Sequence, residues 1–169
     1  MKRYLFLLLM ITGSGFVQGQ LPNACSYIAP HEGENWCFFV NNLLSFQGGT
    51  VSASSLPGTL ASGKGCASIS DKDGNLLFYT DGMKVWNKND QVLLYGDKLD
   101  GYIGCTQSSL IVPQPGSENL YYIFTVDFLF SPPFGISKGL NYSRVDMSGN
   151  NVLGELNLLN KRLMDKSPE

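Results

Sequence analysis

Acidic side chains and glycines gather in one short segment, SISDKDGNLLFYTDG (68–82). Asp71, Asp73 and Asn75 stand at alternate positions, which is the spacing of the first three oxygen ligands in an EF-hand calcium loop. The twelfth position of such a loop needs a bidentate glutamate, and here it is Gly82. The segment therefore does not encode an EF-hand, although its carboxylates could take part in a looser metal site.

The same segment has a structural interpretation, which we favour. Asp-Gly between two apolar runs is a strong local signal for a hairpin turn. Asp81 follows the second apolar run directly, as Asp127 follows a later one, and a carboxylate there can accept backbone N–H groups where a strand ends. Asp71, Asp73 and Asp81 remain candidate ligands of a looser metal site, and we predict no cofactor.

Catalytic motifs have little support in the chain. His31 is the only histidine, it stands in a proline-flanked segment, and no Gly-x-Ser-x-Gly motif accompanies it. Paired carboxylates act as acid and base only where two of them face one cleft, which a sequence does not reveal. We therefore predict that the protein is not an enzyme, with a propeller-type glycoside hydrolase as the enzymatic alternative.

Aromatic residues are frequent at 12%, while charged residues make up only 15% of the chain. Several aromatic residues stand at expected strand ends or in loops, where they could stack on sugar rings or anchor a protein partner. These candidate ligand contacts are Trp36, Trp86, Tyr95, Tyr102 and Phe134. The alternative is packing between sheets, which we favour for the two tryptophans.

Four cysteines, Cys25, Cys37, Cys66 and Cys105, allow two disulfides and three pairings in an exported chain. There is neither a C-x-x-C motif nor a second histidine to support a zinc site. We prefer the pairing Cys25–Cys37 with Cys66–Cys105, because the second pair holds similar places in two similar segments. The open alternative is that Cys66 and Cys105 are small buried hydrophobic residues.

The N-terminus has the three-part layout of a cleavable secretory signal. Lys2 and Arg3 precede the apolar run Tyr4–Ile11, and Val17 and Gly19 stand at the −3 and −1 positions of the expected cut. The run is far shorter than the ~20 residues that span a bilayer, so we predict export without membrane insertion after cleavage. Without the leader, 10 basic residues remain of 12 against 14 acidic ones, a net charge of −4. This charge and the lack of a basic cluster disfavour nucleic acid as a partner.

The elements that carry these residues are short apolar runs separated by turns rich in Asn, Asp and Gly, which predicts an all-β domain. Strands are expected at 36–40, 44–46, 66–70, 76–80, 85–86, 91–95, 106–112, 120–127 and 141–147. The segment 47–65 reads as a long surface loop, and the tail after Gly154 favours a strand over a helix.

Two of these segments follow one plan. The matching strands FYTD and IFTVD place Phe78 against Ile123, 45 positions apart, and the strands before them place Ile69 against Leu110, 41 positions apart. A repeat of ~40–45 residues built from short strands is the spacing of β-propeller blades. A Greek-key β-sandwich would give similar strands at similar spacing and is the alternative fold.

The predicted organisation is a signal peptide at 1–19, an irregular lead-in at 20–35 and a β-propeller-like domain at 36–169. At ~40–45 residues per blade, this domain holds about three blades or fewer, and a closed ring needs at least about four. Unpaired sheet edges invite association, so we expect self-association through open edges.

Two segments taken together, GCASISDKDGNLLFYTDGMKVWNKNDQVL (65–93) and CTQSSLIVPQPGSENLYYIFTVD (105–127), resemble a known group. They are similar to the N-terminal propeller-like region of large Bacteroidetes surface proteins of the gliding-motility group. Those proteins often end in a type B sorting domain used by type IX secretion. The aromatic opening Trp36–Phe39, the pair Asn41–Asn42 and GLNYSRVDM (139–147) occur in the order that the resemblance requires.

The resemblance implies an exported β domain that serves adhesion or gliding motility at the cell surface or outside the cell, with no general catalytic motif. Such proteins continue into further modules, so this chain resembles a truncated member without the sorting domain. The periplasm is the expected compartment if the chain ends at Glu169. We predict a non-catalytic binding or scaffold domain for an unidentified protein or glycan at the cell surface. The alternatives are a carbohydrate-binding module or accessory domain of a glycan-processing enzyme, and a remnant without independent function.

Overall fold

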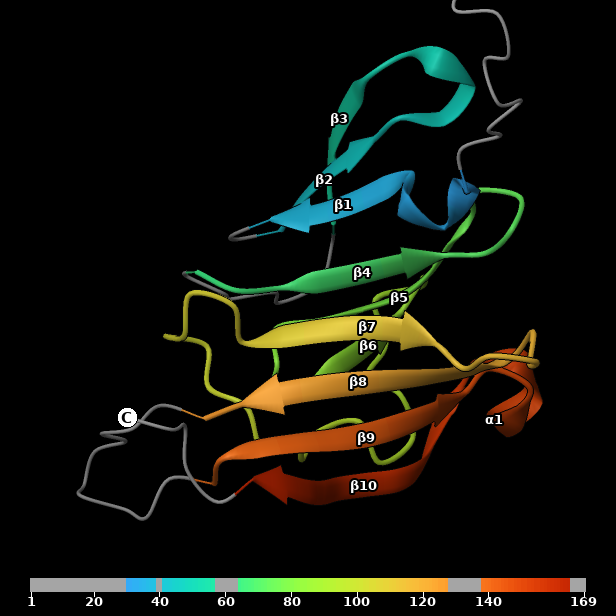
Figure 1. The fold of residues 1–169 in the computed structure, drawn as a ribbon. Coiled ribbons are helices and arrows are strands. Elements are labelled where there is room, and N and C mark those ends of the chain that lie inside the picture. The colour runs from blue at the N-terminus through green and yellow to red at the C-terminus, as the bar shows by residue number, and fades with distance from the viewer. Residues whose placement is uncertain (1–29, 39–40, 57–63, 128–137, 165–169) are drawn as a thin grey trace, which may run out of the picture.

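In a computed structural model, the chain folds into strands joined by short turns (Figure 1). The structure describes residues 30–38, 41–56, 64–127 and 138–164. Ten strands form three antiparallel sheets there, and no sheet within these ranges closes on itself. The all-β prediction is confirmed, whereas the predicted signal peptide at 1–19 lies outside the described residues.

The first sheet has the order β1 (Asn35–Phe38), β2 (Asn42–Ser45), β3 (Ser52–Ser55). The second has the order β4 (Ala67–Ser70), β5 (Leu76–Thr80), β6 (Val85–Asn87). The third has the order β10 (Glu155–Met164), β9 (Leu140–Asp146), β8 (Leu120–Val126), β7 (Ser109–Pro113). Three short helical turns complete the described part of the chain: η1 (His31–Gly33), η2 (Gln47–Gly49) and α1 (Gly149–Val152).

The Asp-Gly segment forms the turn of the β4–β5 hairpin, as its sequence predicts. Asp71 Oδ1 accepts the backbone N–H groups of Asp73 and Asn75, both at 2.9 Å. Gly74 takes a φ of +82°, a left-handed conformation that glycine adopts without a side-chain clash. The carboxylate of Asp71 is therefore used to close the turn.

The third sheet begins with a second hairpin, β7–β8, which corresponds to the β4–β5 hairpin in the repeated plan. Along β8 and β9, every second residue is buried. Ile123 and Val145 point into the core, and Phe124, paired with Tyr142, points to the opposite face. The strict alternation means that this sheet has one buried face and one open face.

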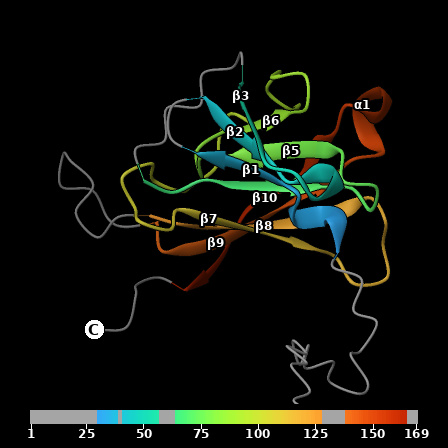
Figure 2. The ribbon, with the colours of Figure 1, turned by 90° about the horizontal axis from the view of Figure 1, so that it is seen from above.

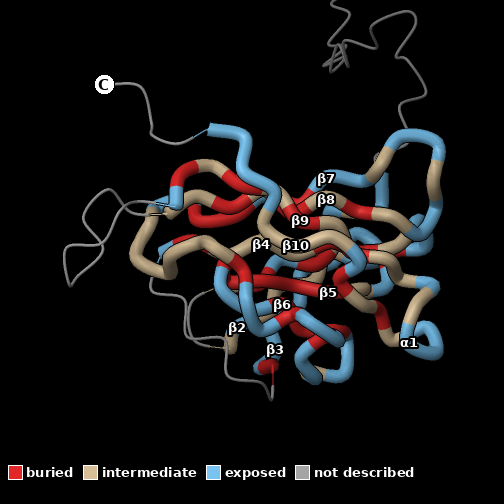
Figure 3. The backbone as a smooth tube through the Cα atoms, turned by 90° about the horizontal axis from the view of Figure 1, so that it is seen from below, coloured by how far each residue is buried: buried red, intermediate tan, exposed pale blue. Residues whose placement is uncertain are grey.

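The second sheet lies between the other two and is packed on both of its faces (Figure 2). Phe78 belongs to a cluster shared with Ile123 and the rest of the third sheet. Tyr79 and Trp86 belong to a second cluster, shared with Cys37 of the first sheet. Burial on both faces explains why the β5 sequence, LLFYT, is almost entirely apolar, and Figure 3 shows this strand buried along most of its length.

Side chains connect neighbouring sheets where no backbone ladder does. Strand β1 lies beside β4, and β4 lies beside β7 with the same direction (Figure 1). Ser68 Oγ of β4 donates to the carbonyl oxygen of Asn35 at 2.7 Å. Ser108 Oγ, just before β7, lies 2.9 Å from the carbonyl oxygens of both Gly65 and Asp81. The buried hydroxyl of Ser108 and the half-buried hydroxyl of Ser68 thus help to fix how the three sheets meet.

Two strand predictions are wrong. The segment 47–65 contains strand β3, which the sequence conceals because Ser-Ala-Ser-Ser has no apolar alternation. The predicted strand at 91–95 is reduced to isolated bridges at Val92 and Leu94, since Tyr95 takes a φ of +63° that ends extended pairing. The tail is a strand, β10, as predicted.

Candidate functional site

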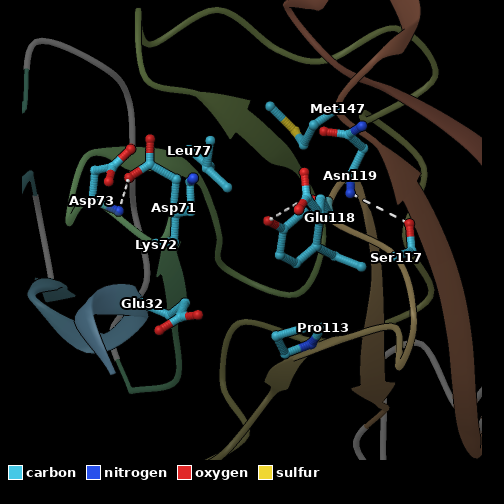
Figure 4. A pocket seen from close by; sticks show the side chains of 11 residues that line it. Glu32, Asp71, Lys72, Asp73, Leu77, Pro113, Ser117, Glu118, Asn119 and Met147 are labelled. Carbon is cyan, nitrogen blue, oxygen red and sulfur yellow. Dashed lines mark hydrogen bonds between the residues drawn. The ribbon is translucent and has the colours of Figure 1, made fainter. Parts of the chain in front are cut away.

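A cleft of about 450 Å³ opens at one end of the second and third sheets, where their turns meet (Figure 4). The β4–β5 turn contributes Asp71 and Asp73, and the segment 117–119 before β8 contributes the opposite wall. Glu32 of η1 and Tyr121 of β8 also line the cleft. Met147, after β9, adds a fourth segment to the turn of β4–β5, the turn of β7–β8 and η1, so the cleft exists only in the folded molecule.

Negative charge dominates the lining. The ionisable side chains, apart from that of Tyr121, are Glu32, Asp71, Lys72, Asp73 and Glu118. Burial raises the pKa of the Tyr121 hydroxyl, and the nearby carboxylates of Asp71 and Glu32 raise it further. The hydroxyl therefore stays protonated, and it donates to the carbonyl oxygen of Glu118 at 3.2 Å.

The candidate metal ligands do not assemble in this cleft. Burial tends to raise the pKa of Asp71, but the hydrogen bonds from Asn75 and Asp73 outweigh it and hold that pKa below its usual value. Asp81 is at the far end of β5 from Asp71 and Asp73, so the three candidates do not share a site. Among the described residues, no three His, Cys, Asp or Glu side chains are placed to hold a metal ion together.

The carboxylates at strand ends shape turns, which is the interpretation we favoured. Asp81 is buried, and its Oδ1 accepts the backbone N–H groups of Met83 and Lys84, both at 2.8 Å. Asp127 accepts the N–H of Lys138 at 2.9 Å. In the cleft, Asp71 and Glu118 stand on opposite walls (Figure 4).

The aromatic residues singled out in the sequence do not form one platform. Trp36 is 50% exposed on β1, whereas Trp86 is buried at 2% exposure and stacks on Tyr79, which removes it from contact with a ligand. Tyr95 is exposed in a turn after β6, and Tyr102 is half-buried. Phe134 lies outside the described residues.

A different set of apolar side chains is gathered on the open face of the third sheet. We call it the outer aromatic face, and its members are Leu110, Val112, Tyr122, Phe124 and Tyr142. The three rings contact one another, with centroids 5.9 to 6.4 Å apart. Leu110 is 51% exposed and pairs with Phe124 across the β7–β8 ladder, which makes the face continuous. The alternation in LYYIFTV indicates two faces, but it does not reveal which face is left open.

The predicted Cys66–Cys105 bridge is not present, since no disulfide joins Cys37, Cys66 and Cys105 to one another. The Sγ atom of Cys66 instead donates to the carbonyl oxygen of Cys37 at 2.7 Å. Cys25, the other half of the predicted Cys25–Cys37 bridge, lies outside the described residues.

Comparison with known proteins adds no relative to this description. No protein-family model, no curated protein and no solved structure matches the chain. Within the described ranges, no helix is both long and apolar enough to cross a membrane. The function must therefore be argued from the surfaces of the molecule itself.

Proposed function

We propose that this chain is a non-catalytic binding domain that docks a partner protein on the outer aromatic face. One observation carries the proposal: on one face of the third sheet, Leu110 and Val112 are exposed and lie beside three half-buried rings, those of Tyr122, Phe124 and Tyr142. Contiguous exposed apolar surface of this kind marks interaction sites on soluble proteins.

The molecule itself indicates what kind of surface would fit. Both apolar faces of the second sheet are covered by other sheets, through Phe78 on one side and Tyr79 on the other. The outer aromatic face is likewise made of aromatic and aliphatic side chains, and it is the far side of the third sheet, which packs on the second through Ile123. A partner that presents an apolar β-sheet surface would cover it as the sheets cover one another. Tyr122 and Tyr142 are suited to such a contact, because tyrosine is enriched in protein interfaces.

Charge on this face favours an apolar protein surface over a polyanion. Arg144 and Asp146 stand next to one another along β9 on the same face, so their charges balance. Arg144 Nε also donates to Asn157 Oδ1 at 2.9 Å. On β10, Lys161 pairs with Tyr142 and Glu155 pairs with Asp146, which adds one charge of each sign. Within the described ranges, the face therefore has no basic excess that would attract nucleic acid or an anionic membrane.

The cellular location that we propose for this domain is inferred from the sequence. The N-terminal leader and the resemblance to Bacteroidetes surface proteins support an exported domain that meets its partner protein at the cell surface. The shared direction of β4 and β7, the first strands of two neighbouring sheets, supports a propeller-like arrangement of the sheets. In that arrangement, the outer aromatic face is where a further sheet would pack.

Site-specific photocrosslinking tests the proposal. The full chain, carrying a photoreactive phenylalanine at position 110, is produced in cells of the source organism and irradiated. We expect a protein adduct from position 110 and none from position 51, where Val51 is 66% exposed but lies outside the face. Adding Tyr122→Glu on the outer aromatic face should abolish the adduct while leaving the chain folded.

Three outcomes would overturn the proposed docking. The first is that neither position crosslinks, and the second is that both positions crosslink equally. The third is an adduct of another class: twice the mass of the chain would identify a second copy as the occupant, and a carbohydrate adduct would identify a glycan.

A further inference from the structure

We propose that Cys37 and Cys66 form an intramolecular disulfide that joins the first sheet to the second when the chain meets a disulfide oxidant. This cross-link is a modification site separate from the proposed docking face. It differs from both of the bonds that we predict from the sequence, Cys25–Cys37 and Cys66–Cys105.

The strands already hold the two cysteines together. Ser68 of β4 accepts the N–H of Cys37 at 3.2 Å and donates to Asn35 at 2.7 Å, which fixes β4 beside β1. Cys66 Sγ is 2.7 Å from the carbonyl oxygen of Cys37, so it lies within about 5.5 Å of the Cα atom of that residue by standard bond lengths. The β1–β4 contact sets the separation of the two Cα atoms, for which a disulfide requires ~4.4–6.8 Å. Rotation of the two side chains about their Cα–Cβ bonds then brings the sulfur atoms together within the cluster that they share.

The direction of the side chains separates this pairing from Cys66–Cys105. Successive residues of an extended chain point to opposite sides. A Cβ atom built on Gly65 would point at the carbonyl oxygen of Cys105, 2.9 Å away, and at Ser108. The next side chain, that of Cys66, points the other way, into the cluster that contains Cys37. The backbone thus passes near Cys105 while the thiol faces Cys37.

The two thiols differ in a way that assigns their roles. Cys37 is 4% exposed, and burial raises its pKa to about 12, with the nearby Cys66 adding to the shift. Cys66 is only half-buried, so an oxidant can reach it first. Since the thiolate is the attacking species, Cys66 is the entry point and Cys37 the resolving thiol.

The oxidant can be any small disulfide, written RSSR, such as oxidised glutathione. The Cys66 thiolate attacks one sulfur of RSSR, which forms a Cys66–SR mixed disulfide and releases RS⁻. The Cys37 thiolate then attacks Cys66 Sγ, which forms the Cys37–Cys66 bond and releases the second RS⁻. The two thiol protons end on the two released thiolates, and the two electrons reduce RSSR to two RSH.

Peptide mapping tests the pairing, because trypsin and a glutamate-specific protease together place each cysteine in a different peptide. Cleavage after Glu34 and Lys64 leaves Cys37 in peptide 35–64, and cleavage after Lys72 leaves Cys66 in peptide 65–72. The reduced full-length chain is incubated with oxidised glutathione, its remaining thiols are alkylated, and it is digested without reductant. We expect peptides 35–64 and 65–72 to be linked, in the wild type and in Cys105→Ser.

A stability measurement provides a second readout. Oxidation should raise the melting temperature of the wild type and of Cys105→Ser by roughly 5–10 °C, because the bridge closes a loop of about 30 residues. Cys66→Ser should show no such gain. Three outcomes would each overturn the proposal. Peptide 65–72 could be linked to the peptide of Cys105, or Cys25 could be linked to Cys37. The third outcome is that both Cys37 and Cys66 are still alkylated after oxidation.

Discussion

At the scale of single residues, Tyr79 has a buried ring, and its hydroxyl group has a hydrogen-bond partner. The residue is fully buried, and its ring stacks on Trp86 with centroids 5.5 Å apart and an interplanar angle of 15°. Its hydroxyl donates to the carboxylate of Asp90. Burial and the Asp90 charge raise the pKa of the hydroxyl, so that it remains a donor.

Tyr79→Phe keeps the ring and removes the hydrogen bond to Asp90. We expect the free energy of unfolding to fall by about 1–2 kcal/mol, since the carboxylate loses a partner in a part-buried site. Urea denaturation followed by circular dichroism measures this change. Tyr95→Phe is the matched control, because Tyr95 is 62% exposed, and it should leave the midpoint unchanged. Equal stability of Tyr79→Phe and the wild type would contradict the role of the hydrogen bond.

The Cys37 thiol makes the stability of the reduced protein depend on pH. Burial raises its pKa to about 12 in the folded state, while an unfolded cysteine ionises near pH ~8.5. A raised pKa gives stability that is fully present below about pH 8.5 and is lost as the pH climbs toward 12. Between neutral pH and about pH 10, we expect the urea midpoint to fall less steeply in Cys37→Ala than in the wild type. Parallel declines would show that this thiol does not couple folding to pH.

At the scale of elements, the side chains of strand β8 alternate between the buried core and the outer aromatic face. Ile123 is fully buried in the main core, while its neighbour Phe124 stands on the outer aromatic face. Successive side chains of a strand serve opposite faces. The two residues are therefore a matched pair for testing which face of the sheet holds the fold together.

Ile123→Ala should lower the free energy of unfolding by about 2–5 kcal/mol, because it leaves a cavity between two sheets. Phe124→Ala should cost about 1 kcal/mol or less, because water already reaches its site. Urea denaturation of both variants measures the difference. If the two losses were similar, the outer face would be covered in solution and would belong to the core.

Local sequence patterns predict the hairpins. Other features depend on residues that are close in space but far apart in the sequence. The β4–β5 hairpin follows from an Asp-Gly turn between two apolar runs, and the role of Asp81 follows from its place after a strand. Strand β3 is invisible in sequence because its stability comes from pairing with β2. The neighbour of Cys66 depends on which strand lies beside β4, and cysteine spacing carries no such information. Of the two tryptophans for which the sequence favours packing, Trp86 is buried and Trp36 is 50% exposed, a difference that depends on which sheet covers each strand.

At the scale of the whole molecule, the second sheet couples the other two. Its two faces belong to different clusters, one shared with the third sheet and the other with the first. Separation of the first sheet would expose Tyr79 and Trp86, and separation of the third would expose Phe78. The loss of either contact leaves the middle sheet half-exposed, so we expect the described part of the molecule to unfold as one cooperative unit.

The two tryptophans allow this cooperativity to be measured. Trp36 is 50% exposed and Trp86 is 2% exposed, so Trp36→Phe leaves a single buried reporter at the contact between the first and second sheets. In this variant, the urea midpoint from Trp86 fluorescence should coincide with the midpoint from far-ultraviolet circular dichroism, which reports all three sheets. A fluorescence change at lower urea would mean that the first sheet opens before the rest. Oxidation that links Cys37 to Cys66 should then bring the two midpoints together, because the bridge ties the first sheet to the second.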